Sequence, residues 1–325
     1  MVLESLIGEK NIRNHPVFIF FLAMLICAGS LFFAQLLFPL HASVLSIAFI
    51  TIGLVPLVYN VLSHEEDDET LCKNSSCTTF FARHFNLIML YVWIFLGIIV
   101  AFAFYYSILP PLERASLFEE QISSFCGIAG SSSCTDGVPM SITGRASAFG
   151  MNACMSNNST VETCTLFIFE NNAGVLLFTI VLSLLYGVGA IFILAWNASI
   201  LGVFFGETLL VGDFTKFLGM FQSMVIGHGA PELFGYIFGA LAGAVLSSMF
   251  AKKEFFTHSS SLIIKDILFL SFLAFFSVAY GAVTEAVGIL HYSELYFIMG
   301  FLYLLLIILA VFFYGKARSN SSLSL

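Results

Sequence analysis

Charged residues are scarce in this chain: only 10% of its 325 residues are Asp, Glu, Lys or Arg. A soluble domain usually carries about 25% charged residues. Hydrophobic residues make up 59% of the chain, and phenylalanine alone accounts for 38 positions. This composition excludes an ordinary soluble domain and predicts an all-α fold, a polytopic bundle of transmembrane helices.

Motifs of the common soluble enzymes are also missing. The chain contains no glycine-rich phosphate loop, nucleophile elbow or HExxH motif, and no basic aromatic patch that would bind nucleic acid. The net charge is −8, and the acidic run HEEDDE at 64–69 indicates a solvated linker rather than a binding face. We therefore expect the lipid bilayer as a partner, no nucleic-acid partner and, on balance, no enzymatic activity.

Seven apolar stretches have roughly the length needed to cross a bilayer core of about 30 Å. They cover residues 16–39, 42–62, 85–109, 173–196, 231–250, 266–290 and 295–314. Residues 198–226 are apolar too but include Glu207, Asp213, Lys216 and several glycines, so this segment can be an eighth span, a re-entrant segment or an interfacial helix. The sequence predicts seven to eight spans.

The domain organisation follows from these stretches and the polar segments between them. We predict a cytoplasmic N-terminus (1–15), a transmembrane helical hairpin (16–62), a cytoplasmic acidic linker (63–84), a core membrane domain (85–314) and a cytoplasmic tail (315–325). Within the core domain, residues 110–170 are predicted to form one long extracytoplasmic loop.

The positions of the basic residues predict the orientation, because cytoplasmic segments of membrane proteins are enriched in Lys and Arg. Of 12 such residues in the chain, the loop 110–170 holds only Arg114 and Arg145. Most others lie in the N-terminus, the linker, residues 251–265 and the tail. These segments are therefore expected in the cytoplasm and the loop outside, which requires residues 198–226 to cross the membrane an odd number of times.

Four of the seven cysteines lie in the predicted outer loop. An even number of cysteines in an exported segment predicts disulfides, here two with three possible pairings. The four are Cys126, Cys134, Cys154 and Cys164. Cys72 and Cys77, in the linker motif CKNSSC, are expected to be ordinary cytoplasmic thiols rather than a zinc site.

The stretch HGAPE at 228–232 places a histidine and a glutamate between apolar segments. Ionisable groups inside a bilayer are costly, so His228, Glu232 and Glu285 are candidate functional residues. Proline is favoured at the first position of a helix, so Pro231 is predicted to begin a span with Glu232 in its first turn. Glu232 is then either a helix cap or part of a polar site.

Small residues form a seam along this predicted helix. One face of it carries Glu232, Gly235, Gly239 and Gly243. The three glycines form two overlapping GxxxG motifs, which predict close helix packing. The 266–290 span carries a similar small polar stripe, from Ser277 to Gly288, with Glu285 beside it. Packing the two faces together would bring Glu285 towards Glu232 or His228.

Three asparagines flank the predicted span 173–196. Asn171 and Asn172 precede this span and Asn197 follows it. They are either ordinary helix caps or members of a polar set that includes His228 and the two glutamates.

Several segments of the chain resemble the stage II sporulation protein M family of integral membrane proteins, in its archaeal branch. They are FENNAGVLLFTIVLSLLYGVGAIFILAWNASILG, GHGAPELFGYIFGALAG, a late helix with TEA, and the opening MVLESLI. The resemblance implies a multi-pass protein of the plasma membrane without an established catalytic activity. It also implies a polar signature, which consists of Asn171, Asn172, Asn197, His228, Glu232 and Glu285.

Three functions fit these observations. The favoured one is a membrane scaffold or assembly factor whose partners are other membrane or envelope proteins. The second is a transporter or channel-like permease that uses Glu232 and Glu285. The third is an intramembrane metal-dependent hydrolase, with His228 and Glu232 as candidate zinc ligands and Glu285 or His291 completing the site. We expect no cofactor in the first two cases and zinc only in the third. The sequence leaves the oligomeric state open.

Overall fold

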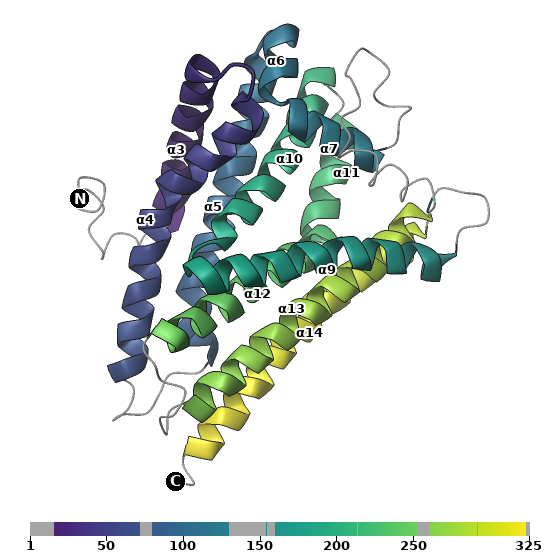
Figure 1. Cartoon of the computed structure of the whole chain (residues 1–325). Helices are drawn as coiled ribbons and strands as arrows, with labels where there is room; N and C mark the ends of the chain where they lie inside the picture. The colour runs from purple at the N-terminus through teal and green to yellow at the C-terminus, as the bar shows by residue number, and fades with distance from the viewer. Residues whose placement is uncertain are drawn as a thin grey trace.

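The computed structural model describes residues 16–71, 80–129, 154, 160–212, 214–251, 260–290 and 292–322, which are helical apart from short turns (Figure 1). No β-strand occurs within these ranges. The helices are α3 (Pro16–Leu37), α4 (Ala42–Leu71), α5 (Phe80–Ile108), α6 (Pro111–Leu117), α7 (Glu119–Ala129), α9 (Val161–Tyr186), α10 (Ala190–Val211), α11 (Phe214–Val225), α12 (Gly229–Ala251), α13 (Ser260–Ile289) and α14 (Ser293–Ser322).

Seven of these helices are long and apolar enough to cross a membrane, namely α3, α4, α5, α9, α10, α12 and α13. Helix α14 contains a shorter apolar segment, Glu294–Ala310. The prediction of an all-α polytopic bundle with seven to eight spans is therefore confirmed.

The long helices pack as two groups inclined to one another (Figure 1). Helices α3, α4, α5 and α10 form one group, and α9, α12, α13 and α14 form the other. Within the first group, Gly206 of α10 allows a close approach to α5, because a Cβ there would lie 3.0 Å from the carbonyl oxygen of Ala103. Helix α11 contacts both α10 and α12, so it links the two groups.

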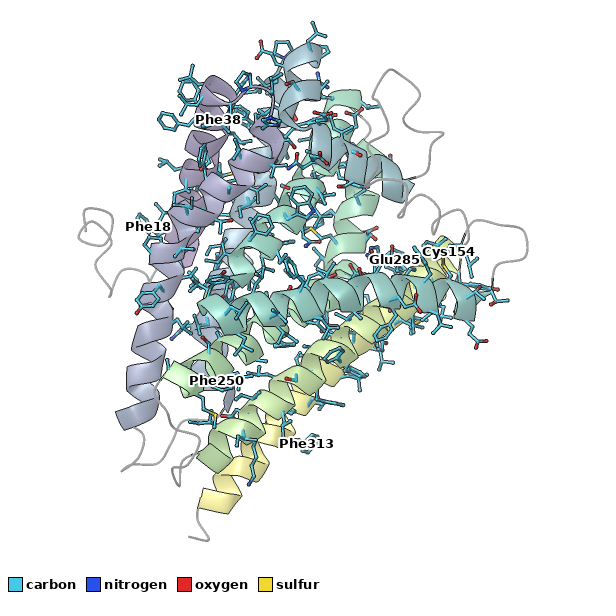
Figure 2. The ribbon with its side chains drawn as sticks, viewed as in Figure 1. Phe18, Phe38, Cys154, Phe250, Glu285 and Phe313 are labelled. Carbon is cyan, nitrogen blue, oxygen red and sulfur yellow. A yellow bond between two sulfur atoms is a disulfide. The ribbon has the colours of Figure 1, made fainter. Side chains whose placement is uncertain are left out.

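Large apolar side chains cover much of the outer surface of the bundle. Figure 2 shows Phe18, Phe38, Phe250 and Phe313 at its periphery, and each is between 44% and 61% exposed. A soluble monomer rarely exposes so many large apolar groups. The surface is that of a protein whose surroundings are lipid.

The predicted span 173–196 is wrong, because the chain turns in the middle of it. Helix α9 begins at Val161, after a capping box made by Thr160 and Thr163, and ends at Tyr186. Gly187 then adopts a positive φ of 68°, a conformation that favours glycine. Helix α10 begins at Ala190, so residues 198–226 comprise the second half of α10 and the separate helix α11.

Several helices extend into polar segments that the sequence predicts to be a linker or a loop. Helix α4 continues to Leu71 and α5 begins at Phe80, so both extend into the predicted linker 63–84. The predicted loop 110–170 contains α6, α7 and the first part of α9. The reason is that a helix can continue into water, where polar side chains end the membrane span without ending the helix.

A disulfide bond joins Cys154 and Cys164. Both cysteines are buried and pack with Ile168 of α9 and with Ala282 and Ala286 of α13. The pair belongs to one of the three predicted pairings. The side chains of Cys126 and Cys134 lie outside the described residues.

Candidate functional site

Helices α11 and α12 are separated by a short break at Ile226, Gly227 and His228. The Gly227 N–H closes α11 by donating to the carbonyl oxygens of Gln222 (3.2 Å) and Ser223 (3.1 Å). Helix α14 packs tightly against the break, because a side chain at Gly227 would overlap the Tyr296 ring and one at Gly300 would overlap the Ile226 carbonyl. The break is therefore a fixed feature of the packed bundle.

The imidazole of His228 is held by Tyr296 of α14. The Tyr296 hydroxyl lies 2.9 Å from His228 Nδ1 and also hydrogen-bonds the Ser223 hydroxyl. Tyr296 is only 8% exposed, so these bonds are shielded from solvent. When Nδ1 carries the proton, it donates to the tyrosine oxygen and leaves the lone pair of Nε2 available to a ligand.

The carboxylate of Glu232 is held by a different helix, α9. Asn172 donates its Nδ2–H to Glu232 Oε1 over 2.9 Å, and Asn171 donates to the Asn172 side-chain oxygen over 3.2 Å. Helix α12 begins at Gly229, two residues before Pro231, and the Glu232 N–H bonds the His228 carbonyl (3.2 Å). The amide of Asn172 thus orients this carboxylate across the helix interface.

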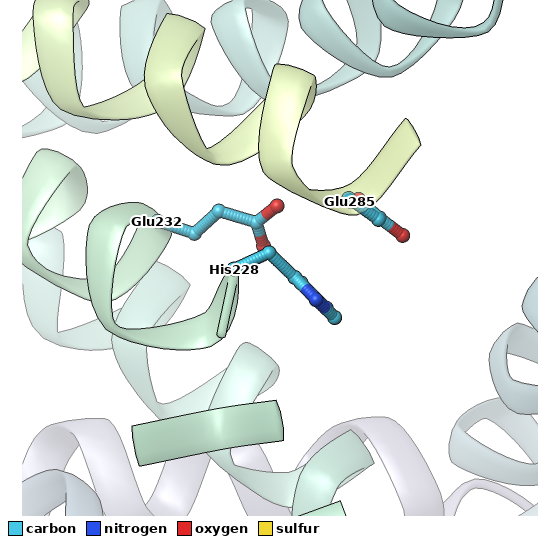
Figure 3. A group of neighbouring side chains, drawn as sticks. All are labelled: His228, Glu232 and Glu285. Carbon is cyan, nitrogen blue, oxygen red and sulfur yellow. The ribbon is translucent and has the colours of Figure 1, made fainter. Parts of the chain in front are cut away.

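Glu285 of α13 completes a cluster with His228 and Glu232 (Figure 3). One side-chain ligand atom of each residue lies within 4.8 Å of the others, and all three side chains are partly buried. Figure 3 shows Glu232 and Glu285 approaching the same space from facing helices. Histidine nitrogen and carboxylate oxygen are ligand atoms that divalent metals accept.

Glycines bring the helices close enough for this cluster. A Cβ at Gly281, one turn before Glu285, would lie 3.0 Å from Glu232 Cγ. A Cβ at Gly235 would lie 3.2 Å from the carbonyl oxygen of Ala274 on α13. Gly239 and Gly243 instead face α9, where they meet Ile180 among other residues. The glycine seam of α12 is therefore shared between two neighbouring helices.

The six residues of the predicted polar signature fall into two sets. His228, Glu232, Glu285 and Asn172 come together, and Asn171 bonds to Asn172 at the edge of the cluster. Asn197 donates to the Ile193 carbonyl of its own helix over 2.8 Å. In the described part of the chain, Asn197 therefore serves α10 and not the cluster.

Tyr296 and Ser223 support the cluster by hydrogen bonds, and neither residue was predicted from the sequence. Tyrosine is common where membrane helices meet the interface, so Tyr296 in SELYF carries no distinctive signal. Ser223 lies in the ambiguous segment 198–226. The position of Ser223 could have indicated its role, because it lies five residues before His228, near the end of α11.

The two carboxylates of the cluster have no lysine or arginine beside them, within the described part of the chain, that would neutralise their charge. Among the described residues, no Lys or Arg forms an ion pair with Glu232 or Glu285. Two carboxylates this close cannot both be ionised without a compensating charge. The arrangement can therefore take up a proton or a metal cation.

The disulfide marks the end of the bundle at which the cluster lies. Ala286, which packs with Cys154 and Cys164, directly follows Glu285 in the sequence. Figure 2 shows Glu285 and Cys154 at the same end of the second helix group. The cluster thus lies towards the end of the bundle that carries the disulfide.

Comparisons with known proteins leave this geometry as the basis for assigning a function. No protein-family model, curated protein or solved structure matches this chain. The resemblance to the stage II sporulation protein M family therefore stays a prediction.

Proposed function

We propose that this multi-pass membrane protein is a cation-coupled transporter or channel-like permease, with His228, Glu232 and Glu285 as its cation-binding site. The observation that carries the proposal is the convergence of these three side chains at the break between α11 and α12. Transporters commonly place ion sites at discontinuous helices, where free backbone groups and side chains face the same space. The cluster combines such a break with ionisable groups from two facing helices.

The two carboxylates favour this function over the membrane scaffold expected from the sequence. A scaffold needs a packed bundle, which the glycine contacts of α12 already provide. Buried charges are poor sources of stability, because well-packed apolar groups usually stabilise at least as well. A pair of partly buried acids without a Lys or Arg partner in the described residues is better explained by a bound cation.

The proposal includes an orientation in the plasma membrane with both termini in the cytoplasm. Seven apolar helices and the shorter segment of α14 would make eight crossings, which return the chain to its starting side. Helix α11 has 12 residues and spans about 18 Å, too short to cross. The Cys154–Cys164 bond and the scarcity of basic residues in 110–170 support an outer location for that loop.

Flux measurements in proteoliposomes test the proposal. Uptake of protons and of Zn²⁺ would be followed with trapped fluorescent indicators for wild type, Glu232→Gln and Glu285→Gln. Loss of a site carboxylate should lower uptake at least about tenfold, the scale on which metal-site changes act. Glu207→Gln is the matched control, because Glu207 is a partly buried acid of α10 that bonds the Tyr106 hydroxyl (2.8 Å).

Wild-type uptake no faster than that of protein-free liposomes would refute the permease. Equal uptake by wild type and both cluster variants would also refute the role of the cluster. In either case the scaffold function would be tested next, by capture of other membrane or envelope proteins.

A metal-dependent hydrolase is the second candidate function. It is favoured by the mixed ligand set, because three protein ligands leave a fourth position open for an activated water. Cleavage of peptide or lipid substrates that stops in Glu232→Gln, without any ion flux in wild type, would favour this function.

A further inference from the structure

We propose that the cluster binds a divalent transition-metal ion of the zinc class, with His228 Nε2 and one carboxylate oxygen each from Glu232 and Glu285 as ligands. Tyr296 and Asn172 are the positioning residues of this site. The inference rests on the proposed function in that it names the cation of the permease.

The ligand geometry suits a small ion. Zinc bonds nitrogen and oxygen at about 2.0–2.2 Å, which places tetrahedral ligand atoms about 3.4 Å apart. One ligand atom of each of the three residues lies within 4.8 Å of the others, so rotation of the side chains can close the remaining gap. The ligands come from the break before α12, the first turn of α12 and the last turns of α13, all fixed by packing.

Two partly buried hydrogen bonds hold the ligands in orientation. Tyr296 lies 2.9 Å from His228 Nδ1, the ring nitrogen opposite the proposed ligand atom. Asn172 donates to Glu232 Oε1 over 2.9 Å and so fixes the plane of this carboxylate beside Glu285. Both residues are only 8% exposed. Metal-binding histidines and carboxylates typically have such partners, which fix the ring orientation and the tautomer.

Charge and ligand type indicate the class of metal. A divalent ion neutralises two carboxylates, which removes the cost of their charges within the bundle. Calcium and magnesium prefer oxygen ligands only, whereas an imidazole nitrogen favours transition metals such as zinc. Three protein ligands leave a position for exchangeable water, which suits an ion that must also be released.

The test is zinc binding by the purified full-length chain in lipid nanodiscs. All proteins would carry Cys72→Ser and Cys77→Ser, so that linker thiols cannot contribute. Metal-stripped samples would be titrated with Zn²⁺ against a chromogenic chelator and their metal content measured. We expect about one zinc per chain in this background, as for a single mononuclear site.

Variants at the cluster assign the ligands. His228→Ala, Glu232→Gln and Glu285→Gln should each abolish stoichiometric binding, and Glu207→Gln should bind as the parent does. Tyr296→Phe keeps the ring but removes the hydroxyl, and it should weaken zinc affinity about 10–100-fold without removing the site. A purely structural tyrosine would change thermal stability and leave the affinity unchanged.

Two results would overturn the metal site. One is a well-folded parent protein that binds no zinc, and the other is equal zinc binding by the parent and the three ligand variants. Proton flux that is lost in Glu232→Gln, without zinc binding in the parent, would remove the metal site and leave the permease. Zinc binding without flux of any cation would remove the permease and leave the metal site.

Discussion

Replacing Gly243 with alanine probes the contact between α12 and α9, on which the position of Asn172 depends. A Cβ at this position would lie 2.6 Å from the Ile180 carbonyl oxygen and 2.7 Å from Ser183 Cβ. Both atoms belong to the fixed frame of α9, so the helices must move apart rather than one side chain rotate. Such overpacking typically costs about 1–3 kcal/mol of the free energy of unfolding.

Gly174→Ala is the matched control on the partner helix. Gly174 is exposed, and a Cβ there would meet no atom within 4 Å. Alanine in a helix interior is favoured over glycine by about 0.5–1 kcal/mol, so this variant should be slightly more stable than wild type. Because the gain from replacing glycine in a helix applies to both variants, the expected difference in unfolding free energy between them is the overpacking cost, about 1–3 kcal/mol.

Unfolding in detergent, followed by the fluorescence of Trp93 and Trp196, measures this difference. Separation of α12 from α9 should also weaken the hydrogen bond from Asn172 to Glu232, and with it the binding of zinc. Equal stability of Gly243→Ala and Gly174→Ala would refute the reasoning that α12 and α9 are in close contact at this position.

Two further predictions concern the disulfide and the pH. Cys154→Ser/Cys164→Ser removes a crosslink between residues ten apart in sequence, which should lower the unfolding free energy by about 3 kcal/mol. Thermal unfolding of both proteins with and without reductant checks this, since reductant should destabilise the wild type more than the variant, and an equal response would contradict it. Because metal ligands must be deprotonated to bind, zinc affinity should fall as the pH is lowered from 7 to about 5. Chelator competition across this range measures the trend, and an affinity that does not change with pH would argue against histidine and carboxylate ligands.

The sequence predicted the fold class because composition alone distinguishes a membrane bundle from a soluble domain. It failed at the turn between α9 and α10, where apolar residues continue through Gly187 and Gly189. The local signal was this closely spaced glycine pair, which interrupts helix without adding any polar residue. Asn171 and Asn172 gave the opposite error, because two polar residues predict the edge of a span whereas both lie within α9.

The site was partly predictable for a similar physical reason. His228, Glu232 and Glu285 stand out because ionisable residues are rare in apolar helices. Their mutual distance depends on how α12 meets α13, which Gly235 and Gly281 permit but do not specify. The role of Tyr296 could not be predicted from the sequence, because it depends on the packing of α14 against the break between α11 and α12.

X-ray absorption at the zinc edge tests the central claim most directly, using the zinc-loaded protein in nanodiscs. The proposed site predicts a shell of nitrogen and oxygen atoms at about 2.0–2.2 Å, with the outer scattering of one imidazole. His228→Ala should lose both the imidazole signal and the bound zinc. A sulfur shell at about 2.3 Å, or zinc without any imidazole, would contradict the assignment of the metal to His228, Glu232 and Glu285.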